Sequence, residues 1–204
     1  MPRTAAKLVL ASGSPQRKQL LAEAGYTFRV CVPSDFAECG VCSRETPGEL
    51  VARLAFQKAV DVVEQLANSS QPLAEDETIV ACDTLAECMG QILGKPRNEH
   101  HAREMLALLS GREHRVYSGL CLWSAGAAAP RLRVERTTLR MDRLDEAQIA
   151  EYLASRQWEG KAGAFGYQDR VGWLHIVSGS ESNVVGLPLE LLAEMLETTP
   201  PRAD

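Results

Sequence analysis

Residues 8–17, which read LVLASGSPQR, decide the fold of this chain. The apolar residues at the start of this stretch predict a short strand, and the small residues after them predict a turn. Ser14 is placed to cap a following helix, and Pro15 suits the first turn of that helix. Because strands and helices continue to alternate along the chain, we expect a layered α/β domain.

The start of this predicted helix also favours a bound anion. Its first N–H groups and the helix dipole attract negative charge, and Arg17 and Lys18 add two cations beside them. A phosphate site is therefore one interpretation of the stretch, and a purely structural strand–helix junction is the other.

Composition narrows the classes of protein to consider. The chain has 204 residues, 45% hydrophobic and 24% charged, with a net charge of -5. That length suits one sizeable domain or two small lobes. The acidic balance argues against a nucleic-acid partner, and the absence of a long apolar stretch argues against a membrane partner. We expect a cytoplasmic protein, since the N-terminal residues carry no apolar signal segment.

The six cysteines are scattered and indicate reduced thiols rather than a disulfide framework. Cys39 and Cys42 form a single C-x-x-C pair, with no second pair and no downstream histidines at matching spacing. A metal or redox site is possible at such a pair, but a structural loop is the favoured interpretation.

Periodicity and capping signals predict the elements of the domain. Thr46 and Glu49 form a capping box for a long helix, and Asp145 and Gln148 form another. Residues 133–141 form the second strand of a predicted hairpin, and their alternation of apolar and polar side chains changes phase near Thr137. This change predicts a β-bulge. We expect helices over residues 15–24, 46–67, 98–109, from 145 and 187–196, and strands over 8–11, 78–82, 115–123, 133–141 and 173–177.

Lys58 and Asp83 are charged residues at positions where apolar ones are expected. Lys58 falls on the apolar stripe of the long helix, so its side chain either extends to the edge of the core or points into a site. Asp83 directly follows the predicted strand 78–82, where a carboxylate is costly unless it binds a metal, a proton or a hydrogen-bond network. The ends of strands in open α/β sheets are also where ligands gather.

Two loops behind Asp83 have the composition of ligand-binding segments. Residues 93–96 (LGKP) place Lys95 between a glycine and a proline, and residues 161–168 (KAGAFGYQ) are rich in small residues. Each segment alone is compatible with a simple turn, but together with Asp83 and residues 8–17 they indicate a site.

These segments together resemble the Maf proteins, a family of nucleoside triphosphate pyrophosphatases related in fold to the inosine triphosphate pyrophosphatases. The resemblance runs from about Lys7 to Leu196. It rests on seven ordered matches: LASGSPxR (10–17), AxxKA (55–59), CDT (82–84), GKP (94–96), LSG (109–111), KAGAFGxQ (161–168) and VVGLPL (184–189).

The resemblance implies a fold and an assembly. It predicts a mixed, strongly curved sheet flanked by helices, with two lobes around a cleft. The chain is then a single domain over residues 1–204, with an ordered core of about residues 7–197. The family resemblance also implies a homodimer.

The same resemblance implies hydrolysis between the α- and β-phosphates of a nucleoside triphosphate, with a divalent cation such as Mg²⁺ or Mn²⁺. Asp83 is expected to act as general base or to hold the metal that activates water, and Glu38 is a further expected metal ligand. The residues expected to bind the triphosphate are Ser12, Arg17, Lys58 and Lys95.

Three positions bear on the substrate. Thr84 and Gln168 match the branch of the family that hydrolyses dTTP and UTP, whereas Gln16 departs from it, because that branch usually has arginine there. The alternatives are a 7-methyl-GTP or broad-specificity pyrophosphatase and, in another class, a non-catalytic nucleotide-binding regulator of cell division. His100 and His101 lack partners with metal-ligand spacing and are expected to be solvated residues of a helix.

Overall fold

The computed structural model describes residues 7–35, 45–169 and 171–198. Its centre is a seven-stranded mixed sheet in the order β2-β1-β3-β5-β6-β7, with β4 paired to β3. The strands are Lys7–Ala11 (β1), Phe28–Val30 (β2), Glu77–Cys88 (β3), Gln91–Leu93 (β4), Glu113–Ser124 (β5), Arg131–Met141 (β6) and Leu174–Ser178 (β7). The helices are Pro15–Glu23 (α1), Pro47–Ala67 (α2), Glu99–Leu109 (α3), Glu146–Ala154 (α4), Glu181–Val185 (α5) and Leu189–Glu197 (α6).

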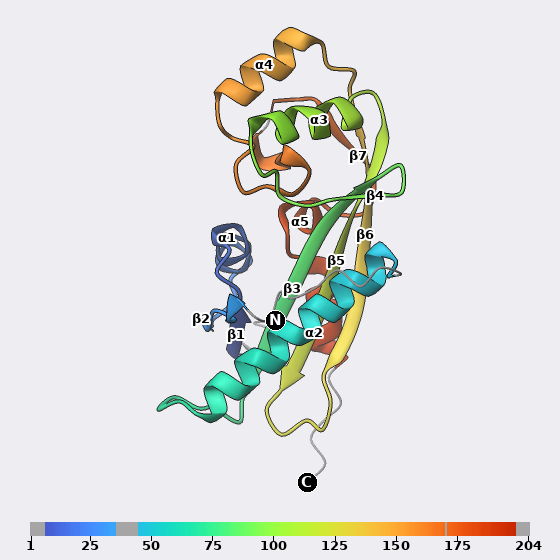
Figure 1. Cartoon of the computed structure of the whole chain (residues 1–204). Coiled ribbons are helices and arrows are strands. Elements are labelled where there is room, and N and C mark those ends of the chain that lie inside the picture. Colours follow the sequence, from blue (N-terminus) through green and yellow to red (C-terminus); the bar gives the residue numbers. More distant parts are fainter. Residues whose placement is uncertain (1–6, 36–44, 170, 199–204) are drawn as a thin grey trace.

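The sheet divides into a parallel and an antiparallel part. β1 pairs in parallel with both β2 and β3, whereas β3, β5, β6 and β7 pair antiparallel in succession. The long strands β3, β5 and β6 extend through the whole molecule, from the lobe that carries α1 and α2 to the lobe that carries α3 and α4 (Figure 1). The expected curved sheet with two lobes is confirmed.

Helix α2 covers one face of the first lobe. The predicted capping box is present at its start, with Thr46 and Glu49 each bonding to the other's backbone N–H. Its apolar stripe packs on β1 and β3 around Ala55, Ala59 and Val62. The helix lies so close to β5 that a Cβ built on Gly119 would be 2.2 Å from the Val51 carbonyl oxygen. Only glycine permits this approach.

The other face of this lobe packs against α1 and α6. Leu21 of α1, Leu8 and Leu10 of β1, and Leu191 and Leu192 of α6 are members of a single buried cluster. Burial of each leucine contributes roughly 1.5–3 kcal/mol, so the two faces of the sheet hold β1 firmly in place. The end of β1 is therefore a fixed point from which residues 12–17 extend.

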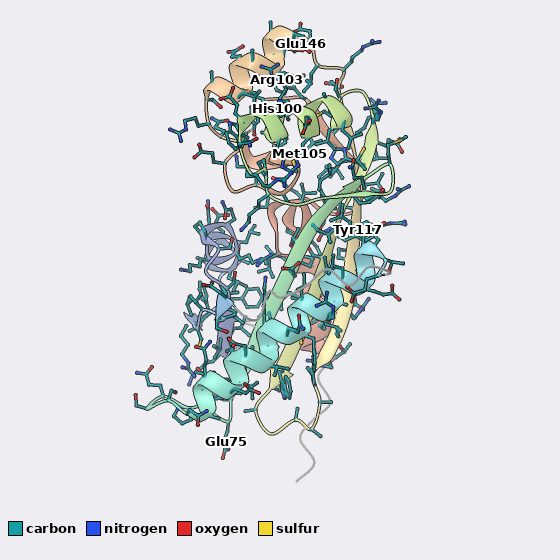
Figure 2. The ribbon with its side chains drawn as sticks, viewed as in Figure 1. Glu75, His100, Arg103, Met105, Tyr117 and Glu146 are labelled. Atoms are coloured by element: carbon teal, nitrogen blue, oxygen red, sulfur yellow. The ribbon has the colours of Figure 1, made fainter. Side chains whose placement is uncertain are left out.

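The second lobe has its own core beneath α3 and α4. The predicted apolar face of α3, which includes Met105 and Leu109, is buried there (Figure 2). An exposed ion pair between Arg103 of α3 and Glu146 of α4, 2.9 Å long, joins the two helices at the surface. The predicted capping box of Asp145 and Gln148 begins α4.

One prediction about the strands was wrong. Asp83 does not follow the last residue of its strand, because β3 continues to Cys88. Continuous antiparallel pairing with β5, from Thr78 opposite Ser124 to Glu87 opposite Arg115, maintains strand geometry past Asp83. What ends at this point is the neighbouring strand β1, whose last paired residue, Ala11, lies opposite Ala81.

The remaining element predictions differ from the structure at their ends. The pairing of β6 with β7 shifts register between Thr138 and Leu139, one residue from the bulge predicted near Thr137. The last predicted helix, 187–196, begins later, at Leu189, because Pro188 occupies its N-cap. None of the helices in the described ranges is both long enough and apolar enough to cross a membrane.

Candidate active site

A cavity of about 660 Å³ opens where the edge of β3 has no neighbouring strand. On this edge, β1 pairs with β3 only up to Ala81 of β3, and β4 pairs with β3 only from Ala86 onward. Residues 82–85 therefore lie at a free edge between the two lobes, where side chains from both faces of the sheet reach one space. Asp83 and Thr84 both line the cavity, although successive residues of a strand point to opposite faces.

Arg17 connects three segments at one end of this cavity. Its Nε donates to the Gly186 carbonyl at 2.7 Å, and its Nη1 and Nη2 donate to Ser12 Oγ and Thr84 Oγ1, each at 3.2 Å. Thr84 Oγ1 is also within 2.8 Å of Ser118 Oγ on β5. The predicted residues Ser12, Arg17 and Thr84 are thus in direct contact, and the guanidinium is held in a fixed position.

The turn before α1 contributes backbone and amide groups to the same end. Ser14 caps the helix, as predicted: its Oγ accepts from the Arg17 N–H at 3.4 Å. The same hydroxyl donates to Gln16 Oε1 at 2.9 Å, which orients the Gln16 amide in the wall of the cavity. Because Pro15 has no N–H and the Arg17 N–H bonds to Ser14 Oγ, the start of α1 acts on this space chiefly through its dipole.

Lys58 and Asp83 form an ion pair across the cavity wall. Lys58 Nζ lies 2.6 Å from Asp83 Oδ1, and the two side chains are only 7% and 16% exposed. Of the two positions considered for Lys58, the structure supports the one in which it points into a site. Burying this pair costs desolvation energy for both charges, which a structural role would not require at this position.

Residues 93–96 and 161–169 form the wall that the second lobe contributes. Lys95 is exposed and lines the cavity, and the Gly163 N–H donates to the Gly94 carbonyl at 3.0 Å, which joins the two loops. Lys161 forms an ion pair with Asp169, whose carboxylate also accepts from the Tyr152 hydroxyl at 2.6 Å. The predicted small-residue loop is thus fastened at both of its ends.

The cavity has two chemically different ends. We call Ser12, Arg17, Lys58, Asp83 and Thr84 the polar end. The apolar end lies in the second lobe, and only two of its residues, Leu109 and Phe165, belong to segments that the sequence had singled out. The residues of the apolar end are Leu109, His114, Val116, Leu139 and Phe165.

Comparison with known proteins agrees with this geometry. The family described as "Maf-like protein" matches residues 7–199. The chain belongs to the Maf family. A protein of Rhodopirellula baltica named dTTP/UTP pyrophosphatase is 56% identical over 93% of this chain and 81% of its own length. One of Rhizobium meliloti with the same name is 43% identical over 90% and 87%.

A solved structure confirms the fold. The Ham1 protein of Staphylococcus aureus superposes with a TM-score of 0.50 at 12% identity, covering 94% of this chain and 98% of its own. This superposition confirms the predicted fold, which is that of the inosine triphosphate pyrophosphatases.

Each of the seven Maf motifs of the sequence contributes at least one residue to this cavity. Glu38, Cys39 and Cys42 lie outside the described residues. Gln168 lies in the short helical turn Tyr167–Asp169, and its role stays a prediction. The remaining predicted site residues, Ser12, Gln16, Arg17, Lys58, Asp83, Thr84 and Lys95, all line the cavity.

The adjacent histidines of α3, His100 and His101, do not line the cavity, as expected. His100 is exposed and lies 3.3 Å from Glu104, one helical turn away. His101 Nδ1 accepts from the Arg97 backbone N–H at 3.3 Å. Within the described part of the chain, no three His, Cys, Asp or Glu side chains form a metal-binding group.

The polar end nevertheless fits one hard divalent cation. Mg²⁺ commonly takes one or two carboxylates and completes its shell with waters and substrate phosphates, rather than with an all-protein cage. Asp83 supplies a carboxylate at the wall of the cavity, and Asp35 lines the same space. The donor set therefore suits a cation that arrives with a polyphosphate.

Proposed function

We propose that this chain hydrolyses nucleoside triphosphates to nucleoside monophosphate and pyrophosphate, with dTTP and UTP as its main substrates. The observation that carries the proposal is the buried Lys58–Asp83 pair beside Arg17, at the polar end of the cavity of a Maf protein. The names of the relatives from Rhodopirellula baltica and Rhizobium meliloti support the same activity.

The polar end supplies the charge that a triphosphate requires. The start of α1 offers its dipole, and Arg17 presents a guanidinium that Ser12 and Thr84 hold in place. Lys58 and Lys95 add ammonium groups on two other walls. As the bond between the α-phosphorus and the bridging oxygen breaks, these cations stabilise the negative charge that gathers on the departing pyrophosphate.

Asp83 is the group that moves the proton. Lys58 fixes its Oδ1, so the carboxylate keeps one orientation toward the cavity. A water molecule attacks the α-phosphorus, its proton passes to Asp83, and pyrophosphate leaves with the bridging oxygen. In the alternative role, Asp83 and, we propose, Glu38 would hold a Mg²⁺ or Mn²⁺ that neutralises phosphate charge and acidifies the water.

The proposed pyrimidine preference rests on two positions, Thr84 and Gln168, together with the names of the relatives. Thr84 and Gln168 are the residues of the dTTP/UTP branch, whereas Gln16 supplies an amide where that branch carries arginine. We further propose a cytoplasmic homodimer that removes nucleotides from the pool, which rests on the family resemblance. A non-catalytic regulator of cell division would have no use for a buried pair at positions 58 and 83.

A product assay tests the proposal. Purified protein is incubated with Mg²⁺ or Mn²⁺ and, separately, with dTTP, UTP, CTP, 7-methyl-GTP and the purine triphosphates. We expect pyrophosphate and the monophosphate as products, fastest from dTTP and UTP. A preference for 7-methyl-GTP would contradict the assignment of dTTP and UTP as the main substrates. If no substrate yields pyrophosphate, the proposed enzymatic activity is refuted.

Asp83→Asn tests the residue that carries the chemistry. We expect kcat to fall by about 10²- to 10⁴-fold, the usual contribution of a general base, with the fold intact by circular dichroism. Asp76→Asn is the matched control, because Asp76 lies directly before the same strand and pairs with Lys7 at the surface. Full activity in Asp83→Asn would show that Asp83 is not the general base.

A further inference from the structure

We propose that Ser118 is a positioning residue for the reaction: its hydroxyl orients Thr84, which in turn fixes the guanidinium of Arg17. This assignment rests on the proposed function, in which Arg17 binds the phosphates of the substrate. Ser118 lies directly opposite Thr84 in the antiparallel pairing of β3 with β5. It does not line the cavity, so its effect on the substrate passes through Thr84.

The first argument is the isolation of the Ser118 hydroxyl. Ser118 is fully buried, and its Oγ lies 2.8 Å from Thr84 Oγ1. Within the described part of the chain, Thr84 is the one hydrogen-bond partner of this hydroxyl. Leaving a buried polar group unpaired costs about 1–3 kcal/mol. The bond between the two hydroxyls is therefore strongly favoured over any arrangement that breaks it.

The second argument is that the other contacts of Thr84 decide which hydroxyl donates. Thr84 Oγ1 accepts from Arg17 Nη2 at 3.2 Å and donates to the Gly186 carbonyl at 3.2 Å. A hydroxyl has a single proton, so Thr84 cannot also donate to Ser118. Ser118 is then the donor of their bond. Both lone pairs of Thr84 Oγ1 are occupied, and its hydroxyl serves to hold Arg17 rather than to bind a ligand.

The third argument is what this arrangement leaves free on Arg17. A guanidinium carries five N–H groups. The Nε group donates to the Gly186 carbonyl at 2.7 Å, and one proton of each Nη group goes to Ser12 or Thr84. One N–H remains on Nη1 and one on Nη2, and this pair can bind two phosphate oxygens at once. Since such a fork works in one orientation, the bond to Thr84 determines how Arg17 meets the phosphates.

The same two strands carry a second pair of this kind, away from the cavity. Thr78 Oγ1 and Ser124 Oγ are 3.0 Å apart and also lie directly opposite each other on β3 and β5. Neither residue lines the cavity. Hydroxyl pairs across strands contribute about 0.2–1 kcal/mol to a sheet. If Ser118 had only this structural task, the two pairs would be equivalent in their effect on the reaction.

A double-variant cycle tests the assignment. The kcat/KM for UTP is measured for the wild type, Ser118→Ala, Thr84→Val and the protein that carries both substitutions. We expect Ser118→Ala to lower kcat/KM by about tenfold, because the guanidinium is no longer held in its productive orientation. Valine keeps the shape of threonine without its hydroxyl, so Ser118→Ala should cost less than about twofold in the Thr84→Val background. Losses that multiply in the double variant would overturn the assignment.

Ser124→Ala is the matched control, because it removes the serine hydroxyl of the second pair. We expect its kcat/KM to stay within about twofold of the wild type, whereas its thermal stability should fall by about as much as that of Ser118→Ala. Equal losses of kcat/KM in the two alanine variants would show a general effect of the sheet and would also overturn the assignment.

A measurement without substrate separates this assignment from the proposed function. If the wild type releases no pyrophosphate from any triphosphate, the proposed activity fails, but the mobility of Arg17 still decides the role of Ser118. Nitrogen-15 NMR of the ligand-free protein measures rotation about the Nε–Cζ bond of Arg17, with Arg17→Lys to assign the signal. We expect this rotation to be about tenfold faster in Ser118→Ala and unchanged in Ser124→Ala. Equal rates in the wild type and Ser118→Ala would refute the assignment, whatever the activity.

Discussion

The two ends of the cavity differ in how their polar groups are satisfied. At the polar end Arg17, Ser12, Thr84, Lys58 and Asp83 already bond to one another before any ligand is bound. At the apolar end His114 keeps a buried nitrogen without a partner. The difference teaches that the two ends have different chemistry: the first is built of charged and hydroxyl groups that already bond to each other, and the second is an apolar wall with one buried histidine.

Lys58→Met should affect the polar end most strongly after Asp83 itself. The substitution keeps the length and apolar stem of the side chain but removes the ammonium that fixes Asp83 Oδ1 at 2.6 Å. We expect kcat/KM to fall by about 10²- to 10³-fold for every triphosphate tested, because the lost contact serves the phosphates and not the base. Steady-state kinetics on UTP, dTTP and CTP measures this.

Arg53→Met is the matched control for this variant. Arg53 lies on the same helix, one and a half turns before Lys58, and its ion pair with Glu45 lies outside the cavity. The two variants lose the same charge, so a general electrostatic effect would lower both activities alike. A Lys58→Met protein within threefold of the wild type would show that the pair does not organise the polar end.

The acid stability of the protein probes the apolar end without any substrate. The pKa of His114 is lowered from 6.5 in the unfolded chain to about 4 in the fold. Between these pH values the unfolded chain binds a proton that the folded one does not, so the free energy of unfolding decreases as the pH falls. The difference amounts to roughly 3 kcal/mol and is complete near pH 4.

Urea unfolding at a series of pH values measures this contribution. The wild type should lose more stability between pH 6.5 and pH 4 than His114→Leu, which has no group to titrate at that position. His175→Leu is the control, since His175 is exposed beside Asp142. Parallel curves for the wild type and His114→Leu would mean that the ring at position 114 is protonated in the fold as readily as in water.

The polar end could be predicted from the sequence largely because its parts are local. The strand, turn, Ser14 cap and Arg17 occupy ten consecutive residues, and caps and helical periodicity depend on neighbours within one turn. The charge on the apolar stripe at Lys58 was visible for the same reason. Its partner was identified only by the structure, because the pairing of residues 58 and 83 depends on how α2 crosses the sheet.

Most of the apolar end could not be predicted, because no local pattern marks the strand residues His114, Val116 and Leu139 as part of a site. Leu109, Val116 and Leu139 look like ordinary core residues of a helix and two strands, and His114 offers no ligand spacing. Whether such residues border a cavity or fill a core is decided by long-range packing of the second lobe. The free edge of β3 was missed likewise, since strand length at Asp83 depends on the partner strand β5 and not on the residues themselves.

Gln16→Arg should have the smallest effect, and it tests whether the two ends are as separate as this comparison implies. Gln16 is the second residue of α1, next to Arg17 of the polar end, and Ser14 Oγ donates to its amide oxygen. An arginine there adds a charge and five donors, which strengthens phosphate binding for every substrate and removes the bond from Ser14. We expect KM to fall up to about threefold for all triphosphates. We also expect the ratio of kcat/KM for dTTP and UTP over CTP to rise by about threefold to tenfold, as in the branch that carries arginine.

The ratio of kcat/KM for dTTP and UTP over CTP shows whether position 16 takes part in selecting the base. If only KM changes and the ratio stays constant, position 16 contributes to charge binding alone, and selection of the base lies elsewhere in the cavity. If the ratio rises, the residue at position 16 takes part in selecting the base as well as in binding charge.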